Sequence, residues 1–273
     1  MIVRYIRSAI IFLLLLSLVK LPKHYAQYTG GFRLSSCHTK LDNRPEWAPS
    51  APPKEVEKIF SQPFFLSQRG SQSYAFMSQD GQYMLKIFAK PLKQCLFAHK
   101  VWPYRPPLDQ AIYHLQMEKG IEGYHLAGKL SSQYTALLYL HLNTTQEMLP
   151  SITLQDSFKR TYTLPLDSYR FVLQKKCELL APVLKKMTKH QPEEIKPLLD
   201  SYLQAIAYRA SLGIRNRDTE FRKNFGLLDK KVIEFDCGEY FYDPALLSTE
   251  EQQKEICLFK NQIEYWINKY KID

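Results

Sequence analysis

The feature that most constrains the fold is the Asp80-Gly81 pair, which lies between two short segments of alternating polarity. Residues 73–77 and 83–88 each place apolar side chains with a period of two residues, and residues 64–66 form a third such segment. An Asp-Gly pair between alternating segments is a strong signal for a β-hairpin. The sequence therefore predicts three antiparallel strands in one sheet.

Downstream of these strands the apolar spacing becomes helical. Residues 108–130 permit a helix, although Gly120, Gly123 and Gly128 interrupt it. Residues 136–142 predict a buried strand. Three further segments repeat apolar residues at helical spacing and predict amphipathic helices: 168–189, 192–212 and 249–270. The order of elements indicates an α+β fold.

The composition excludes some functions and leaves others open. The chain has 273 residues, with 37 Lys and Arg against 27 Asp and Glu, which gives a net charge of +10. Such a balance suits phosphate-rich ligands, anionic lipid or nucleic acid. Nucleic acid is the least favoured, because the aromatic residues lie on strand and helix stripes typical of a core. Five cysteines without a CxxC pair or a Cys/His cluster argue against a disulfide framework or a zinc site.

An uncharged apolar run, Ser8–Val19, lies between Arg7 and Lys20. Twelve helical residues cover about 18 Å of a hydrocarbon core of roughly 30 Å, which suits a signal peptide better than a membrane span. We expect residues 1–26 to be a signal peptide or an N-terminal membrane anchor. Cleavage stays open, because His24-Tyr25-Ala26 is a poor cleavage site, and a buried N-terminal helix is the alternative. The protein would then be membrane-anchored or secreted, on a side of the membrane that the sequence leaves open.

Changes in composition divide the rest of the chain. Residues 27–53 contain Gly and Pro pairs without periodicity, and we interpret them as a linker. An ordered extension that buries Phe32 and Trp47 is the alternative. Residues 54–143 are predicted to form a sheet domain and residues 144–273 a helical domain.

Polar residues with metal-binding chemistry flank a predicted hairpin near the C-terminal end of the chain. Apolar residues lie on both sides of a turn at 229–231, so Asn224 and Asp236 would lie near one another at the ends of two paired strands. An amide oxygen and a carboxylate are hard ligands suited to Mg²⁺. Asp218, upstream in a polar loop, could orient a substrate hydroxyl.

These residues resemble the motifs of the protein-kinase-like superfamily, which includes small-molecule kinases of the aminoglycoside-phosphotransferase type. Lys86 lies on the third strand in Tyr-Met-Leu-Lys-Ile-Phe, Asn216-Arg217-Asp218 and Asn224 are similar to the catalytic loop, and Asp236-Cys237-Gly238 is similar to the metal motif. The order of the motifs agrees over about residues 60–244.

The resemblance implies a two-lobed fold, with a small antiparallel sheet lobe and a shortened helical lobe, and a phosphotransferase that uses ATP and Mg²⁺. It implies a nucleotide site at Gly70 and Lys86, with Glu118 as the helix partner of Lys86 and Glu122 as the alternative partner. Asn224 and Asp236 would hold Mg²⁺, and Asp218 would be the catalytic base. The phosphate acceptor would be a protein or a small molecule that the sequence does not specify.

One departure keeps a second function open. Asn224 lies six positions after Asp218, whereas kinases place this Asn five positions after the catalytic Asp, and Asn216 is a rival for the catalytic position. If Asn216 occupies that position, the base is lost. The protein would then be a pseudokinase-like binding module, at the cell envelope or delivered to a host cell.

Overall fold

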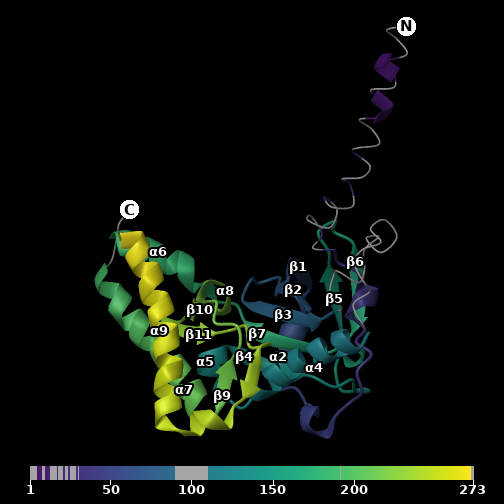
Figure 1. The fold of residues 1–273 in the computed structure, drawn as a ribbon. Helices are drawn as coiled ribbons and strands as arrows, with labels where there is room; N and C mark the ends of the chain where they lie inside the picture. The colour runs from purple at the N-terminus through teal and green to yellow at the C-terminus, as the bar shows by residue number, and fades with distance from the viewer. Residues whose placement is uncertain are drawn as a thin grey trace.

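The computed structural model describes residues 31–89, 110–190 and 192–271, together with isolated positions before residue 31. Figure 1 shows two lobes: a curled sheet with α4 (Gln110–Ala127) beside it, and a group of helices that carries the C-terminus. The structure thus confirms the α+β fold class and the division into a sheet lobe and a helical lobe.

The sheet lobe is built on seven strands in the order β4-β7-β3-β2-β1-β5-β6. Neighbouring strands are antiparallel, except that β1 and β5 are parallel. The strands are β1 (Phe64–Arg69), β2 (Ser73–Ser78), β3 (Tyr83–Phe88), β4 (Leu137–His141), β5 (Ser151–Gln155), β6 (Thr161–Pro165) and β7 (Phe171–Lys175). The short helix α2 (Lys54–Phe60) precedes β1, and α5 (Ser132–Thr135) precedes β4.

The predicted hairpin is confirmed. β2 and β3 pair in the register Met77↔Met84, and Gly81 in the turn between them has φ +72°. The sheet is larger than predicted, because β5, β6 and β7 extend it beyond residue 144. The boundary predicted after residue 143 therefore does not coincide with the end of the sheet.

The helix predicted over residues 168–189 is wrong in its first half. Phe171, Val172 and Leu173 are fully buried in β7, with β3 on one side and β4 on the other. A continuous apolar run of this kind satisfies a strand buried on both faces as well as a helix. The helix begins only at Leu180, after the short strand β8 (Glu178–Leu179).

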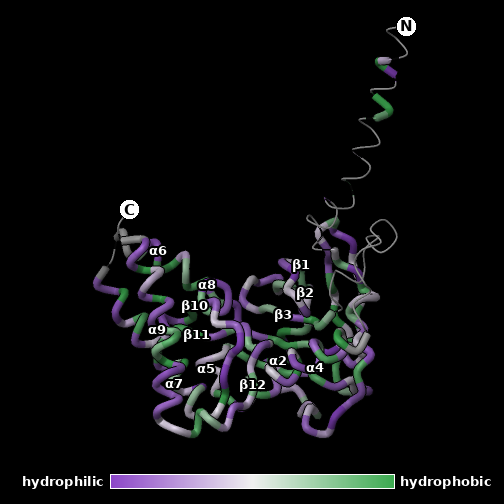
Figure 2. The backbone as a smooth tube through the Cα atoms, in the orientation of Figure 1, coloured by the Kyte–Doolittle hydropathy of each residue, from purple (hydrophilic) through white to green (hydrophobic). Residues whose placement is uncertain are grey.

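Three helices form most of the helical lobe: α6 (Leu180–His190), α7 (Ile195–Ser211) and α9 (Thr249–Lys271). Hydrophobic and hydrophilic positions alternate along α7 and α9 with the turn of the helix (Figure 2). Their apolar stripes meet in a core that contains Tyr202, Phe225 and Phe259. The predictions for residues 192–212 and 249–270 are thus confirmed.

Two small sheets lie in the same lobe. β8 pairs with β10 (Phe225–Leu228), which pairs with β11 (Lys231–Glu234), and β9 (Ile214–Asn216) pairs with β12 (Tyr240–Tyr242). The short helix α8 (Phe221–Asn224) leads directly into β10. Phe225 pairs with Glu234 in the β10–β11 register, so Asn224 and Asp236 flank paired strand ends, as the sequence predicts.

α4 is one continuous helix, although Gly120 and Gly123 lie within it and Gly128 directly follows it. A Cβ atom at Gly123 would lie 2.4 Å from the carbonyl oxygen of Cys237, and a Cβ at Gly120 would lie 1.9 Å from the side-chain oxygen of Gln72. These two glycines therefore let the helix approach neighbouring segments more closely than any other residue would. They mark a packing face of the helix.

The described part of the predicted linker is an ordered extension, which was the alternative interpretation. It contains the 3-10 turns η1 (Leu34–Cys37) and η2 (Pro45–Trp47). Phe32 packs in the core of the sheet lobe and Trp47 in the core beside α4. Burial of these two aromatic side chains fixes the extension to the body of the protein.

The prediction of a transmembrane helix is corrected by the structure. Within the described residues, no helix has both the length and the apolar character needed to cross a membrane. Most of Ser8–Val19 lies outside the described residues, so the signal peptide over residues 1–26 stays a prediction.

The β10–β11 turn allows a test of the fold. Leu228 pairs with Lys231, and the two residues between them, Asp229 and Lys230, have φ +50° and +64°. Positive φ costs a lysine about 1 kcal/mol that glycine does not incur. Lys230→Gly should therefore raise the free energy of unfolding by about that amount, measured by urea denaturation.

Gly81→Lys is the matched control, because Gly81 has φ +72° and open space around its Cβ position. It should destabilise the protein by a similar amount, about 1 kcal/mol. A loss of stability in Lys230→Gly would contradict this assignment of the turn.

Candidate functional site

Lys86 lies where the two lobes meet. Its strand, β3, is central in the large sheet, and the lysine is only 9% exposed. The amine donates hydrogen bonds to the hydroxyl of Tyr124 and to the carbonyl oxygen of Phe235, both at 2.9 Å. Its Nζ lies 3.8 Å from Oδ1 of Asp236. One buried cation thus connects the sheet, α4 and the end of β11.

Tyr124 completes a three-residue cluster with Lys86 and Asp236. Its hydroxyl accepts from Lys86 and donates to Oδ1 of Asp236 at 3.2 Å. Burial, followed by the charge of Asp236, raises the pKa of Tyr124 well above its ordinary value. The residue is therefore a neutral phenol at physiological pH, able to accept one hydrogen bond and donate another.

The main chain before Asp236 is held in place, whereas its carboxylate is accessible. The amide N of Phe235 donates to the carbonyl oxygen of Asn224 at 2.9 Å, and the side chain of Gln174 donates to the carbonyl of Phe235 at 2.9 Å. The side chain of Asp236 is 53% exposed. Its position is fixed by the backbone, so the carboxylate remains open to a ligand.

Two pockets flank this cluster. The first, about 120 Å³, brings three predicted residues together, Gly70, Asp218 and Asp236. Its complete lining is Gly70, Ser71, Gln72, Ser73, Phe88, Tyr124, Asp218, Asp236, Gly238 and Glu239. The second pocket, about 180 Å³, has apolar surface from Met84, Leu179 and Phe235 among polar residues. Its complete lining is Ser67, Gln68, Met84, Lys86, Gln174, Lys175, Lys176, Cys177, Leu179 and Phe235. Larger pockets occur elsewhere, but none of these predicted site residues lines them.

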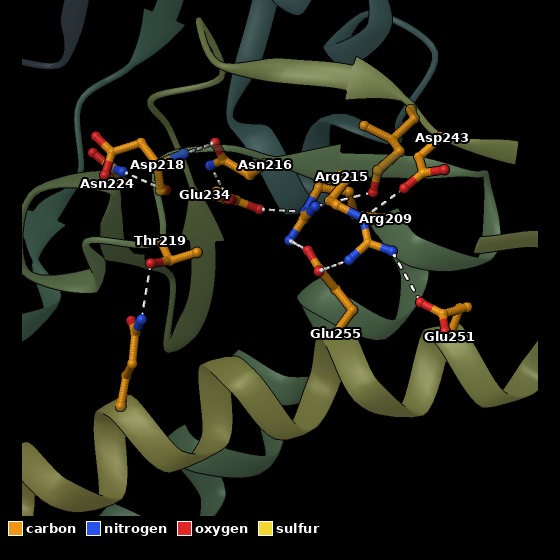
Figure 3. A network of polar contacts seen from close by, with 12 residues as sticks. Arg209, Arg215, Asn216, Asp218, Thr219, Asn224, Glu234, Asp243, Glu251 and Glu255 are labelled. Atoms are coloured by element: carbon orange, nitrogen blue, oxygen red, sulfur yellow. Dashed lines mark hydrogen bonds and ion pairs between the residues drawn. The ribbon is translucent and has the colours of Figure 1, made fainter. Parts of the chain in front are cut away.

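Asp218 occupies the position that faces the pocket, and Asn216 does not. Asn216 is 3% exposed and its amide donates to Glu234 at 2.7 Å. Its side-chain oxygen accepts from the backbone N–H of Asp218 at 2.9 Å (Figure 3). Asn216 is therefore used in holding the loop, and the exposed Asp218 is the residue of the two that lines the pocket.

Asn224 supports the same loop. Its side-chain nitrogen donates to the carbonyl oxygen of Asp218 at 3.0 Å, and the residue is 2% exposed. The bond joins residues six positions apart, which is the spacing that departs from the five positions usual in the kinase catalytic loop. A metal-binding role for Asn224 stays a prediction.

Neither glutamate expected to pair with Lys86 does so. Glu118 pairs with Arg44 at 2.9 Å, and Glu122 accepts from the indole nitrogen of Trp47 at 3.1 Å. Tyr124 takes their place, because it lies on the helix face that Gly120 and Gly123 bring close to the neighbouring chain. The sequence held a signal for this residue, since glycines at i and i+3 mark a close approach and Tyr124 follows the second of them.

A buried ionic network holds the framework behind Asp218 (Figure 3). Arg209 of α7 is fully buried and lies 3.0 Å from Glu234 of β11 and 3.2 Å from Glu255 of α9. Burial lowers the pKa of Arg209, but the charges of Glu234 and Glu255 outweigh it and raise the value above the ordinary one. Arg215 extends the network to Asp243 and Glu251. The network thus ties both helices to the strands that carry the loop.

The first pocket has oxygen donors of the kind that Mg²⁺ accepts. Asp236 offers an accessible carboxylate there, and the carboxylate of Asp218 lies at the same pocket. Mg²⁺ commonly uses one or two carboxylates together with substrate phosphates and water. Within the described residues there is no group of three or more His, Cys, Asp or Glu side chains that could hold a metal by itself.

Removing Arg209, the buried cation of this network, should lower the free energy of unfolding by a large amount. Arg209→Leu would leave Glu234 buried without a cationic partner and Glu255 with Arg215 alone, which costs about 3–5 kcal/mol of unfolding free energy. Arg222→Leu is the matched control, because Arg222 is half exposed and its pair with Glu220 should contribute at most about 1 kcal/mol. Urea denaturation of both variants measures the difference, and equal small losses would contradict the role of Arg209.

Comparisons with known proteins establish no family. No protein-family model matches the chain, and no curated protein does. The similar solved structures include two of WbdD, one of which is described as a bifunctional kinase-methyltransferase.

That structure is 12% identical to the chain, with a TM-score of 0.37, and the match covers 70% of this chain and 34% of WbdD. The second is 11% identical, with a TM-score of 0.38, and the match covers 72% and 36%. The chain thus spans about a third of the WbdD chains it matches. Likeness at this level does not show membership of the protein-kinase-like superfamily, although the two-lobed α+β architecture is consistent with a kinase-like fold.

Proposed function

We propose that the protein is a divergent kinase-like phosphotransferase that binds ATP with Mg²⁺. The observation that carries this proposal is the buried amine of Lys86, held beside the carboxylate of Asp236 between two pockets. A buried lysine is costly unless it has partners, and here the partners leave it beside an accessible carboxylate. This arrangement suits a ligand with an apolar ring at one end and phosphates at the other.

The two pockets differ in polarity, as the base and the phosphates of a nucleotide do. Met84, Leu179 and Phe235 give the second pocket apolar surface for a base. The first pocket has the carboxylates of Asp218 and Asp236 and the polar loop at Gly70. Lys86 is near both, because its amine bonds to Tyr124 of the first pocket and to the carbonyl of Phe235 of the second.

Each polar residue then has a chemical role in transfer. Lys86 would offset the charge of the nucleotide phosphates, and Asp236 would supply oxygen ligands to the metal. Bound Mg²⁺ would neutralise charge that develops on the transferred phosphoryl group. Asp218 would orient the acceptor hydroxyl and accept its proton as the oxygen attacks phosphorus. Positioning and charge neutralisation would supply most of the rate.

The second candidate is a pseudokinase-like binding module. It is favoured by the presence of Tyr124, where the resemblance predicts a glutamate, beside Lys86. A phenol next to Lys86 carries no negative charge, so the lysine lacks the helix carboxylate expected from the resemblance. The altered spacing between Asp218 and Asn224 points the same way. Such a module, if exported, would engage a protein at the envelope or in a host cell.

Nucleotide binding is tested with the full chain by isothermal titration calorimetry with Mg-ATP. Lys86→Met and Asp236→Asn should each weaken binding by about tenfold or more, because each removes a charge that faces phosphate or metal. Lys254→Met, an exposed lysine of α9, is the control and should bind as the wild type does. Absence of wild-type binding at millimolar Mg-ATP would refute the phosphotransferase and leave the binding module.

Turnover separates the enzyme from the inactive module. Asp218→Asn keeps the size of the side chain but removes the base, so ATP hydrolysis should fall by about 10²-fold or more while Mg-ATP affinity is retained. Asp229→Asn, in the exposed β10–β11 turn, is the control. Wild-type protein that binds Mg-ATP without measurable hydrolysis or transfer would favour the pseudokinase.

A further inference from the structure

Residues 39–47, here called the N-terminal strap, connect the sheet lobe to α4. We propose that the strap positions α4, and with it Tyr124, against Lys86, and that Arg44 and Trp47 are positioning residues of the candidate site. The consequence for ligand binding rests on the proposed nucleotide function. The positioning itself rests on contacts that the structure shows.

On the sheet side the strap is held by reciprocal hydrogen bonds to the segment after β4. The side chain of Asn43 donates to the carbonyl of Thr144 and accepts from its N–H, both at 2.9 Å. The backbone N–H of Arg44 donates to Asn143 at 3.0 Å, and Asn143 donates to the carbonyl of Arg44 at 2.7 Å. Paired bonds at two consecutive positions fix the register of the strap on the sheet.

A buried arginine adds a second anchor. Arg170, 1% exposed, donates to the hydroxyl of Thr39 at 2.7 Å, to the carbonyl of Leu41 at 2.7 Å and to the side chain of Asn43 at 2.9 Å. A buried guanidinium requires acceptors, since an unpaired charge away from water is very costly. Detaching the strap would therefore remove several of the acceptors of this cation.

On the other side the strap binds two residues one turn apart on α4. Arg44 pairs with Glu118 at 2.9 Å, and the indole N–H of Trp47 donates to Glu122 at 3.1 Å. The guanidinium of Arg44 lies 4.4 Å from the centre of the Trp47 ring, which orders both side chains. Trp47 is buried in the same core cluster as Tyr124.

The packing of α4 explains why bonds between the strap and this helix matter for the candidate site. The helix packs on β12 of the helical lobe far more than on any strand of the large sheet. Lys86, however, lies on β3 of that sheet. Between α4 and β3 the contact is made by side chains: Lys86 bonds to Tyr124 at 2.9 Å, and the rings of Phe88 and Tyr124 lie 5.7 Å apart, edge to face. A shift of about 1 Å in α4 would break the Lys86–Tyr124 bond. The strap is bonded to both sides and can hold this distance.

The test measures α4 directly and does not require a nucleotide. Hydrogen–deuterium exchange of the full chain should show faster exchange in residues 110–127 of Arg44→Glu, by about threefold or more, because repulsion from Glu118 replaces attraction. Trp47→Phe keeps the ring but loses the donor to Glu122, and the same helix should respond. Lys260→Glu is the control, since it reverses an exposed charge on α9, remote from α4.

Two further variants separate positioning from general loss of structure. The charge swap Arg44→Glu/Glu118→Arg restores attraction and should return α4 exchange to within about twofold of the wild type. Tyr124→Phe should weaken Mg-ATP binding without changing exchange at the strap. In Arg44→Glu, residues 195–211 and 249–271 should exchange as in the wild type, because the bonds of the strap named above go to the sheet lobe and α4.

Unchanged α4 exchange in both Arg44→Glu and Trp47→Phe would overturn the proposal, as would failure of the charge swap to rescue. If the exchange changes as expected, the same variants should weaken Mg-ATP binding by about threefold. Wild-type protein that shows the exchange pattern but binds no Mg-ATP would leave the strap assignment standing and refute the proposed nucleotide function.

Discussion

The amine of Lys86 is the point on which the candidate site depends. A lysine on the central strand of a sheet has to leave the interior or find partners there, because an unpaired buried charge is costly. Here the partners come from two separate segments: the hydroxyl of Tyr124 in α4, and the carbonyl of Phe235 and the carboxylate of Asp236 directly after β11. This cation therefore bonds across the two lobes, and the two pockets lie beside it where the lobes meet.

The helical lobe supports this contact through a second buried charge. Arg209 joins α7, β11 and α9, and Asn216 attaches the loop of Asp218 to Glu234 of the same network. Removing one partner of a buried ion pair destabilises a protein by more free energy than the intact pair contributes to folding. Such a network therefore fixes the geometry of the helical lobe more than it raises the free energy of unfolding. The accessible carboxylates of Asp218 and Asp236 are thus presented from a rigid base.

α4 lies between Lys86 and the helical lobe, and two of its glycines allow it to pack there. Gly120 and Gly123 let it approach Gln72 and the backbone at Cys237, and this brings Tyr124 to Lys86. Glu118 and Glu122, on another part of the helix, are taken by Arg44 and Trp47. A helix that would be destabilised by glycine in isolation is stable here because tertiary contacts on two sides compensate for the lower intrinsic propensity.

What the sequence alone determined is local. The alternation around Asp80-Gly81 specified the first three strands, and helical periodicity specified α7 and α9, because both patterns depend on neighbours in the chain. The common site of Gly70, Asp218 and Asp236 was implied only by the resemblance to kinase-like motifs, and the three residues line one pocket. Tertiary structure decided the rest. Phe171–Leu173 form a strand because β3 and β4 pair on both sides. Tyr124, and not Glu118, reaches Lys86 because it lies on the helix face that Gly120 and Gly123 bring close, whereas Glu118 pairs with Arg44. Tyr124 lies 38 positions from Lys86, and Glu118 lies 74 positions from Arg44. Such pairs depend on where distant segments pack, and no local sequence pattern carries that information.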